Sequence, residues 1–330
     1  MLVNLHPEAD VTIARQALTE LGLWVKPLTN RSGVVCSLEV SSASASVNLN
    51  DIERVPGVTQ VLQPKSSHPL IDAGVGQGVD VGSVCIGGGS PVLIAGPCSV
   101  DSEESIHEIA GLVAASGAGI LRGGAYKPRT SPYSFSGHGA PALNWLRDAA
   151  NEHGLGVVTE VLSETDADRV AAVADMLQVG SRNMQNFALL RSVGQVGKPV
   201  MLKRGRSATV EEWLLAGEHL MAAGAQAVVF CERGVRGFDS QTRNLLDLGT
   251  VALLKHNYRL PIIVDPSHAI GRKDLIRPMV NAAVAAGADA IMVEVNPRPG
   301  SAMSDGPQAI DVPTLQAIAG DIGVWNEVTP

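Results

Sequence analysis

Seven cationic side chains occupy similar places in the sequence, each at or shortly after the end of a short apolar run. They are Arg122, Lys127, Arg129, Arg182, Lys203, Arg204 and Arg233. If the runs are parallel strands of one barrel, their carboxyl ends meet on one face and gather these charges there. Isolated surface cations would instead scatter over helix faces. So many cations suit a substrate with two phosphates, or with a phosphate and a carboxylate.

A second set combines a thiol, an imidazole and two carboxylates, again from run ends or the loops that follow. It consists of Cys98, His268, Glu294 and Asp305. Taken singly, a packed cysteine, a core histidine or a capping aspartate is more common than a metal ligand. Together they suit zinc, manganese or ferrous iron, provided that the fold places its last strand beside its first. We interpret the other three cysteines as structural thiols in or beside apolar strands: Cys36, Cys85 and Cys231.

The elements that must position these residues are predicted from residue 92 onward, where apolar runs alternate with helical stretches. The runs are PVLIAG, GILRGG, GVVTEV, MLQVG, PVMLKR, AVVFCE, PIIVD and AIMVEV. The helical stretches include Glu103–Ser116, Ala140–His153, Glu164–Val173 and Val210–Ala223. A doubly wound sheet usually offers about five to seven strands. Eight units therefore predict an α/β fold, the (β/α)8 TIM barrel, over residues 92–330.

Residues 1–64 predict a separate small domain. We expect strands over MLVNL, LWVKPL, GVVCSLEV and GVTQVLQP, and helices over Glu8–Leu21 and about Leu49–Val55. This order of strands and helices is the split βαβ pattern of ferredoxin-like domains. Residues 65–91 then predict a proline-bounded linker and a short hairpin, at residues 78–87, that leads into the barrel.

The overall composition excludes several classes of protein. The 330 residues are 45% hydrophobic and 18% charged, with a formal net charge of −8, which predicts a globular chain and no nucleic-acid partner. No stretch predicts a membrane span, and the start MLVNLHPEAD lacks the features of a secretory signal. Four scattered cysteines without a CxxC pair are not typical of a disulfide framework. We therefore expect a cytoplasmic protein without a membrane partner.

Seven segments carry a family resemblance and occur in the family's order. They are AGPCSV (95–100), GGAYKPRTSPYSF (123–135), VGSRNMQN (179–186), PVMLKRG (199–205), VVFCERG (228–234), VDPSHAIGR (264–272) and SDGPQ (304–308). From about residue 90 to 312 the chain resembles the 3-deoxy-D-arabino-heptulosonate 7-phosphate (DAHP) synthases. The subgroup is type I beta, with an N-terminal ferredoxin-like domain that residues 1–64 resemble more loosely. The KPRT sequence at 127–130 favours this family over the octulosonate 8-phosphate synthases, which typically have a KANRT-like sequence there.

The resemblance implies a transferase that condenses phosphoenolpyruvate with D-erythrose 4-phosphate and water. The products are DAHP and phosphate, in the first step of the shikimate pathway to aromatic amino acids. The implied cofactor is a divalent metal, manganese first, with zinc, iron or cobalt as alternatives. Its implied ligands are Cys98, His268, Glu294 and Asp305.

The resemblance also assigns the substrates. Phosphoenolpyruvate would be held by Arg122, Lys127, Ser181, Arg182, Lys203 and Arg233, and the phosphate of erythrose 4-phosphate by Arg129 and Thr130. The metal would polarise the aldehyde oxygen. Lys127 is the expected proton carrier to that oxygen, because neighbouring cations favour release of its proton. We thus expect the catalytic residues to be Lys127, His268 and Cys98.

Two positions depart from the family pattern, and two other functions stay open. Asn296 stands where the family usually has a histidine, and an amide cannot titrate. The segment 136–139 (SGHG) differs from the usual FQG-type loop.

One alternative function is a related synthase that uses another aldehyde acceptor. The other is a catalytically silent barrel that serves as a sensor, against which the intact metal set argues.

Residues 1–64 contain no cluster of charged side chains that would suit a substrate phosphate. The family is commonly feedback-inhibited by tyrosine or phenylalanine, so the resemblance implies a regulatory domain with an aromatic amino-acid effector. A role in packing or oligomerisation is the alternative. The resemblance also implies a homo-oligomer, either a dimer or a tetramer.

Overall fold

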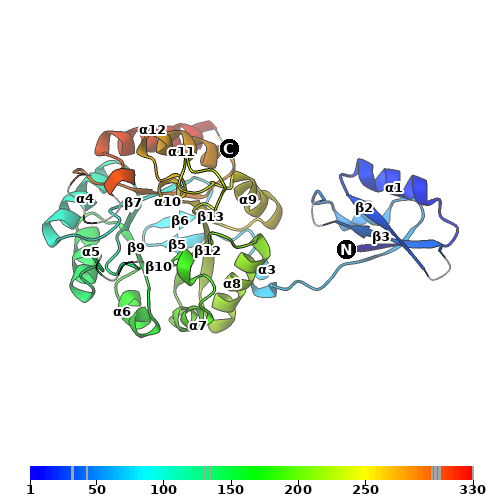
Figure 1. Cartoon of the computed structure of the whole chain (residues 1–330), viewed down its shortest axis with the longest axis horizontal. Coiled ribbons are helices and arrows are strands. Elements are labelled where there is room, and N and C mark those ends of the chain that lie inside the picture. Colours follow the sequence, from blue (N-terminus) through cyan, green and yellow to red (C-terminus); the bar gives the residue numbers. More distant parts are fainter. Residues whose placement is uncertain are drawn as a thin grey trace. The chain divides into compact units, whose positions relative to one another are not determined.

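The computed structural model describes residues 1–30, 33–41, 44–128, 131, 133, 135–298, 300, 303 and 306–328, the last five without their side chains. Within it the chain forms two compact units that divide between Ser67 and His68 (Figure 1). Among the described residues no helix is long and apolar enough to cross a membrane.

The first unit is a four-stranded antiparallel sheet with two helices. Its elements are β1 (Leu2–Leu5), α1 (Val11–Glu20), β2 (Val25–Thr29), β3 (Val35–Val40), α2 (Leu49–Glu53) and β4 (Val58–Leu62). The strands lie in the order β2-β3-β1-β4, and every neighbouring pair is antiparallel. This topology confirms the ferredoxin-like prediction. The core lies where Val3 and Leu5 of β1 join Ala14 and Leu18 of α1 in one buried cluster.

Cys36 corrects one prediction in this unit. Its side chain is exposed, so its assignment as a buried structural thiol was wrong. In the pairing of β2 with β3, Leu28 faces Ser37 and Thr29 faces Val35, which leaves Cys36 as an extra residue at a register shift. A bulge of this kind turns a residue out of the regular alternation.

The second unit is a closed barrel of eight parallel strands, as predicted. They are β7 (Val92–Gly96), β8 (Ile120–Arg122), β9 (Gly156–Glu160), β10 (Met176–Val179), β11 (Pro199–Lys203), β12 (Ala227–Glu232), β13 (Ile262–Val264) and β14 (Ala290–Glu294). Each strand pairs with the next along the chain, and β14 returns to β7, where Glu294 faces Gly96. This closure brings the end of the last strand beside the end of the first.

Helices surround the barrel (Figure 1). They are α4 (Glu103–Ala115), α5 (Ala140–Glu152), α6 (Ala167–Ala171), α7 (Phe187–Gln195), α8 (Val210–Ala223), α9 (Leu248–Ala252), α10 (Pro266–Ile270), α11 (Ile276–Ala285) and α12 (Val312–Val328). Helix α8 has the predicted bounds because a capping box between Thr209 and Glu212 fixes its start. The helix predicted over Glu164–Val173 is a 3-10 turn followed by the shorter α6.

A helix and a hairpin precede the barrel, and the hairpin lies at the end opposite the carboxyl ends of its strands. They are α3 (Pro69–Ala73), β5 (Val79–Val81) and β6 (Val84–Ile86), of which the hairpin was predicted. The hairpin's Val81 and Ile86 are buried in the same cluster as the residues inside the barrel. A Cβ at Gly82 would lie 2.8 Å from Cα of Gly156, the first residue of β9. The hairpin therefore packs against the amino-terminal end of the barrel.

Candidate active site

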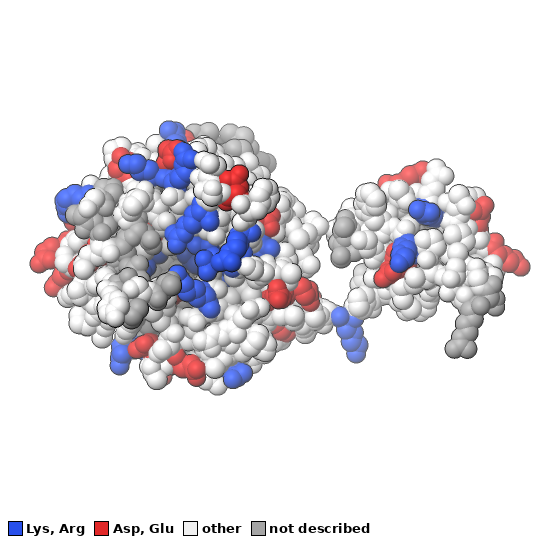
Figure 2. All heavy atoms as spheres, in the orientation of Figure 1, with Lys and Arg blue, Asp and Glu red and all other residues white. Residues whose placement is uncertain are grey.

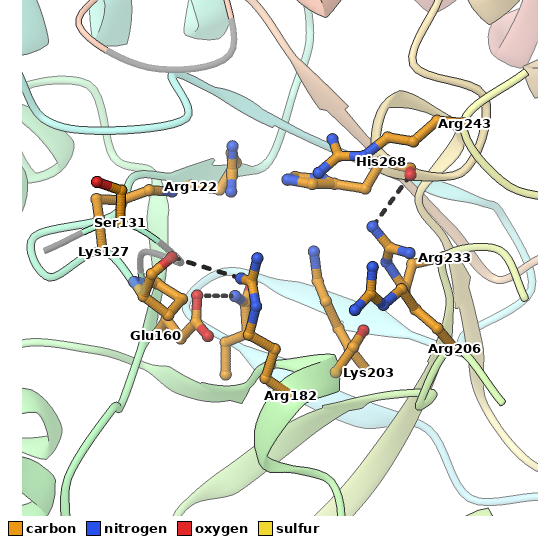
Figure 3. A pocket seen from close by; sticks show the side chains of 14 residues that line it. Arg122, Lys127, Ser131, Glu160, Arg182, Lys203, Arg206, Arg233, Arg243 and His268 are labelled. Carbon is orange, nitrogen blue, oxygen red and sulfur yellow. Dashed lines mark hydrogen bonds between the residues drawn. The ribbon is translucent and has the colours of Figure 1, made fainter. Parts of the chain in front are cut away.

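A cavity of about 350 Å³ opens at the carboxyl ends of the barrel strands. Seven cationic side chains line it: Arg122, Lys127, Arg182, Lys203, Arg206, Arg233 and Arg243. Figure 2 shows Lys and Arg gathered around the hollow at the centre of the barrel unit, and Figure 3 shows these side chains converging on the cavity from several strand ends and loops. The chain thus concentrates positive charge at one place although its net charge is −8.

Arg204, one of the cations predicted to reach this face, lies elsewhere. It is buried, and its Nη1 contacts Oε2 of Glu232 at 3.0 Å and Oδ2 of Asp247 at 2.9 Å. Lys203 ends β11 and points into the cavity, and successive side chains alternate between the two faces of a strand. Arg204 therefore points away from the barrel interior, into a structural ion-pair cluster.

Two cavity-lining cations were missed by the sequence analysis. Arg206 lies three residues beyond the end of β11, close enough to a strand end that the same pattern could have included it. Arg243 lies eleven residues beyond the end of β12, and no sequence signal placed it in the cavity. A long loop can return a side chain to the barrel mouth without leaving a periodic pattern.

Most of the cavity's cations have no carboxylate partner in the described part of the chain. Arg122 pairs with Glu294 and Lys203 pairs with Asp265. The other five cations of the cavity form no ion pair with any carboxylate among the described residues: Lys127, Arg182, Arg206, Arg233 and Arg243. One carboxylate in the cavity wall, Glu160, instead accepts a hydrogen bond from Gln178 at 3.1 Å. An anionic ligand would supply the missing charge.

Two buried polar atoms of the cavity lining have no hydrogen-bond partner in the described part of the chain. They are Nε of Arg122 and Oγ of Ser181. An unsatisfied buried donor costs about 1–3 kcal/mol, so such atoms favour a ligand that supplies acceptor oxygens. Both residues were predicted to bind phosphoenolpyruvate, whose phosphate and carboxylate are rich in acceptors.

Cys98, His268 and Glu294 come together beside the cavity. One potential ligand atom from each lies within 4.8 Å of the others, and Nε2 of His268 is 3.2 Å from Oε1 of Glu294. Bonds of about 2.0–2.3 Å to nitrogen, oxygen and sulfur place the ligand atoms of one metal at comparable separations. The three residues therefore fit a divalent metal, and we call them the metal group. The fourth predicted ligand, Asp305, lies outside the described residues, as do Arg129 and Thr130.

Asp265 orients the imidazole of His268. Its Oδ1 accepts a hydrogen bond from the His268 backbone at the start of α10, and its Oδ2 lies 2.8 Å from Nδ1 of the ring. Burial alone would raise the pKa of Asp265, but the charges of His268 and Lys203 hold that pKa well below its usual value. A carboxylate at Nδ1 leaves Nε2 for a metal. Asp265 is the last residue of the predicted run PIIVD, and that place alone did not indicate this role.

Glu294 ends β14 and is fully enclosed. Its Oε1 accepts a hydrogen bond from Arg122 at 2.9 Å, and its Oε2 accepts one from Nε2 of Gln308. Burial would raise the pKa of Glu294, but the charges of His268, Arg122 and Lys127 and the Gln308 hydrogen bond lower it to about 2. The side chain is therefore a carboxylate near neutral pH, as a metal ligand must be.

Lys127 joins the metal group to the cation-lined cavity. Its Nζ donates to the carbonyl oxygen of Cys98 at 2.8 Å and lies 3.0 Å from Cys98 Sγ. A Cβ at Gly124 would lie 2.7 Å from Cδ of Lys127. Glycine at position 124 therefore leaves the space that the Lys127 side chain occupies. The backbone of Lys127 donates to the carbonyl of Ser136 at 2.8 Å. The segment 136–139, which differs from the family pattern, therefore still fixes the backbone of Lys127 by this hydrogen bond.

Asn296 and Cys231 make structural contacts, Asn296 in a turn and Cys231 in the barrel interior. Oδ1 of Asn296 accepts a hydrogen bond from the backbone of Arg298 at 2.8 Å, so its amide supports the turn after β14. Cys231 is buried inside the barrel as predicted, and burial raises the pKa of its thiol. Cys85 is half-buried at the hairpin.

Comparison with known proteins identifies the family. Residues 61–326 match the family model described as the DAHP synthetase I family. The chain is 47% identical over 265 residues to the phospho-2-dehydro-3-deoxyheptonate aldolase of Thermotoga maritima, which covers 79% of this chain and 77% of that protein. It is 29% identical over 236 residues to a 2-dehydro-3-deoxyphosphooctonate aldolase of Acidithiobacillus ferrooxidans, which covers 66% of this chain and 83% of the relative.

Solved structures agree with this relationship. The crystal structure of the Thermotoga maritima DAHP synthase matches 99% of this chain and 97% of its own, with a TM-score of 0.77 and 38% identity. A truncated form of the same synthase matches 76% of this chain and 92% of its own, with a TM-score of 0.71 and 43% identity. Sequence, fold and site agree, and the chain belongs to the DAHP synthetase I family.

Proposed function

We propose that the protein is a DAHP synthase, which condenses phosphoenolpyruvate with D-erythrose 4-phosphate and water to give DAHP and phosphate. The observation that carries this proposal is the meeting of Cys98, His268 and Glu294 beside a cavity that His268 also lines and that holds five cations lacking a described carboxylate partner. The higher identity to the heptonate enzyme, 47% against 29% for the octonate enzyme, supports erythrose 4-phosphate as the acceptor.

The charge of the two substrates matches the charge of the cavity. A phosphate monoester carries about −1.5 to −2 at neutral pH, so two phosphates and a carboxylate total roughly −4 to −5. This total is close to the charge of the five cavity cations that lack a carboxylate partner among the described residues. We assign phosphoenolpyruvate to Arg122, Lys127, Ser181, Arg182, Lys203 and Arg233, and the phosphate of the aldehyde substrate to Arg129 and Thr130. Arg206 and Arg243 add charge to the same cavity.

The reaction joins the methylene carbon of phosphoenolpyruvate to the aldehyde carbon, after which water adds to the enol carbon and phosphate leaves. A bound metal, which we expect to be manganese, with zinc, iron or cobalt as alternatives, supplies a Lewis acid for the aldehyde oxygen. Fixed Arg and Lys donors stabilise the phosphate and carboxylate charge without reorganising. Lys127 is the proton donor to the aldehyde oxygen, because its Nζ lies between Cys98 and the substrate cavity.

The test is the release of inorganic phosphate from phosphoenolpyruvate by the purified protein. We expect release only when both erythrose 4-phosphate and a divalent metal are present. Release with a pentose phosphate or N-acetylmannosamine instead would assign the barrel to a related synthase. No release with any acceptor would favour the silent sensor barrel.

We propose further that the first unit is a regulatory domain that binds an aromatic amino acid, with tyrosine and phenylalanine as first candidates. In support, it forms a compact unit of its own, and the described catalytic groups all belong to the second unit. We also expect a homo-oligomer, either a dimer or a tetramer, and a cytoplasmic location.

Deletion of residues 1–67 should separate regulation from chemistry. We expect the shortened protein to keep its turnover and to lose inhibition, because an effector acts only through a differential affinity for two states. Such coupling is typically about 1–3 kcal/mol, or roughly 5- to 150-fold in affinity. The measurement is the initial rate of both proteins with tyrosine, phenylalanine or tryptophan. A full-length protein indifferent to all three, or a shortened one that still responds, would refute the regulatory role.

A further inference from the structure

A glutamine amide connects an arginine of the substrate cavity to a carboxylate of the metal group. Nη1 of Arg243 donates to Oε1 of Gln308 at 2.8 Å, and Nε2 of Gln308 donates to Oε2 of Glu294. Gln308 is buried and lies on the 3-10 turn Gly306–Gln308, just after β14 and its loop. Figure 3 shows Arg243 on the cavity wall on the same side as Arg233 and His268.

We propose that Arg243 and Gln308 are positioning residues that hold Glu294 and thereby set the affinity of the site for its divalent metal. This inference rests on the proposed function, because it assumes that Cys98, His268 and Glu294 bind the metal. It assigns to Arg243 a second role besides its charge in the cavity.

The two neighbours of Gln308 fix the orientation of its side-chain amide. An arginine side chain has only donors and an ionised carboxylate has only acceptors. Arg243 therefore holds the amide oxygen, and the amide NH2 group is left to face Glu294. If the amide turned over, its oxygen would face the carboxylate and its NH2 group would face the guanidinium, so both contacts would be repulsive.

The oriented amide in turn holds the carboxylate of Glu294 in place. Gln308 occupies Oε2, while Oε1 faces Nε2 of His268 at 3.2 Å and accepts from Arg122 at 2.9 Å. The backbone of Glu294 is fixed as well, since its NH group donates to Oγ of Ser267 at 3.0 Å and its carbonyl oxygen accepts from the NH group of Ile310 at 2.9 Å. With its backbone and Oε2 held, Glu294 presents Oε1 toward Nε2 of His268. Hydrogen-bond partners of metal ligands typically change metal affinity by about 10- to 100-fold when they are lost.

The experiment measures metal binding to the full-length, metal-free protein in the absence of substrates. Calorimetric titration with Mn²⁺ should give a dissociation constant about 10- to 100-fold higher for Gln308→Met than for the unaltered protein. Gln308→Glu should weaken binding at least as much, because it places a second carboxylate against Glu294. Gln178→Met is the matched control, since Gln178 also donates to a carboxylate of the barrel, Glu160, outside the metal group. Its metal affinity should stay within about twofold of the unaltered protein.

A double-mutant cycle tests the role of Arg243. Arg243→Ala should weaken Mn²⁺ binding in the unaltered background, have little further effect in Gln308→Met, and be partly rescued by Arg243→Lys. Because Arg243 is exposed, these variants should fold even where a Gln308 variant does not. Unchanged Mn²⁺ affinity in both Gln308→Met and Arg243→Ala would overturn the inference alone. An unaltered protein that binds no metal would overturn the proposed metal site and the inference with it.

Discussion

Chelation of divalent metal should abolish turnover, and added Mn²⁺ should restore it. The aldehyde oxygen needs an electrophile, and the structure offers Cys98, His268 and Glu294 as a ready set of ligands beside the cavity. The measurement is the rate of phosphate release before treatment, after treatment with EDTA and dialysis, and after the metal is returned. Full activity in a preparation shown by elemental analysis to be metal-free would refute a metal-dependent reaction.

Cys98→Ser should produce the same loss permanently. A neutral hydroxyl replaces a thiolate ligand, so metal affinity should fall by at least about 100-fold, the upper end of what the loss of a mere supporting contact costs. Cys36→Ser is the matched control, because Cys36 is exposed on the first unit and should change neither metal content nor rate. Cys231→Ser is a poorer control, since it places a hydroxyl in the barrel interior at a cost of about 1–3 kcal/mol.

The barrel, and the convergence of Cys98, His268 and Glu294, could be predicted from sequence because both follow from periodicity. Eight apolar runs imply eight strands, and closure of the last strand on the first brings Glu294 toward Cys98. The predicted directions of side chains were wrong where a shift of one residue along a strand turns a side chain to the other face. Arg204 follows Lys203 directly and so faces the other way, and Cys36 sits at a register shift of its strand.

The contributions of Arg243, Gln308 and Asp265 could not be predicted because they depend on contacts between distant segments. Gln308 stands in the SDGPQ segment that supports the family resemblance, yet its contact with Glu294 becomes visible only once the loop after β14 has been placed. Arg243 reaches that amide from a loop 65 residues away in sequence. Local patterns locate strand ends, but they do not show which loop side chains meet above them.

Lys127 and Arg129 should act on different substrates although they are two residues apart. Lys127→Ala should lower kcat by about 100- to 10,000-fold, the usual contribution of a general acid, because Lys127 Nζ lies 3.0 Å from Cys98 Sγ, at the junction of the metal group and the cavity. Its loss also removes one cation from the phosphoenolpyruvate site. The Michaelis constant of that substrate should therefore rise as well.

Arg129→Ala should instead raise the Michaelis constant of erythrose 4-phosphate and leave kcat largely intact. A charge-assisted hydrogen bond contributes about 1.5–3 kcal/mol, which corresponds to roughly 10- to 150-fold in that constant. The measurement is a steady-state analysis in which each substrate is varied at saturating concentrations of the other, and each variant serves as the control for its neighbour. Equal rises in both Michaelis constants for both variants, with kcat unchanged, would mean that the two cations share one electrostatic role. If Lys127→Ala mainly lowers kcat and Arg129→Ala mainly raises the Michaelis constant of erythrose 4-phosphate, the two roles are separate. The proton donor and the contact to the phosphate of erythrose 4-phosphate then lie on opposite sides of Pro128.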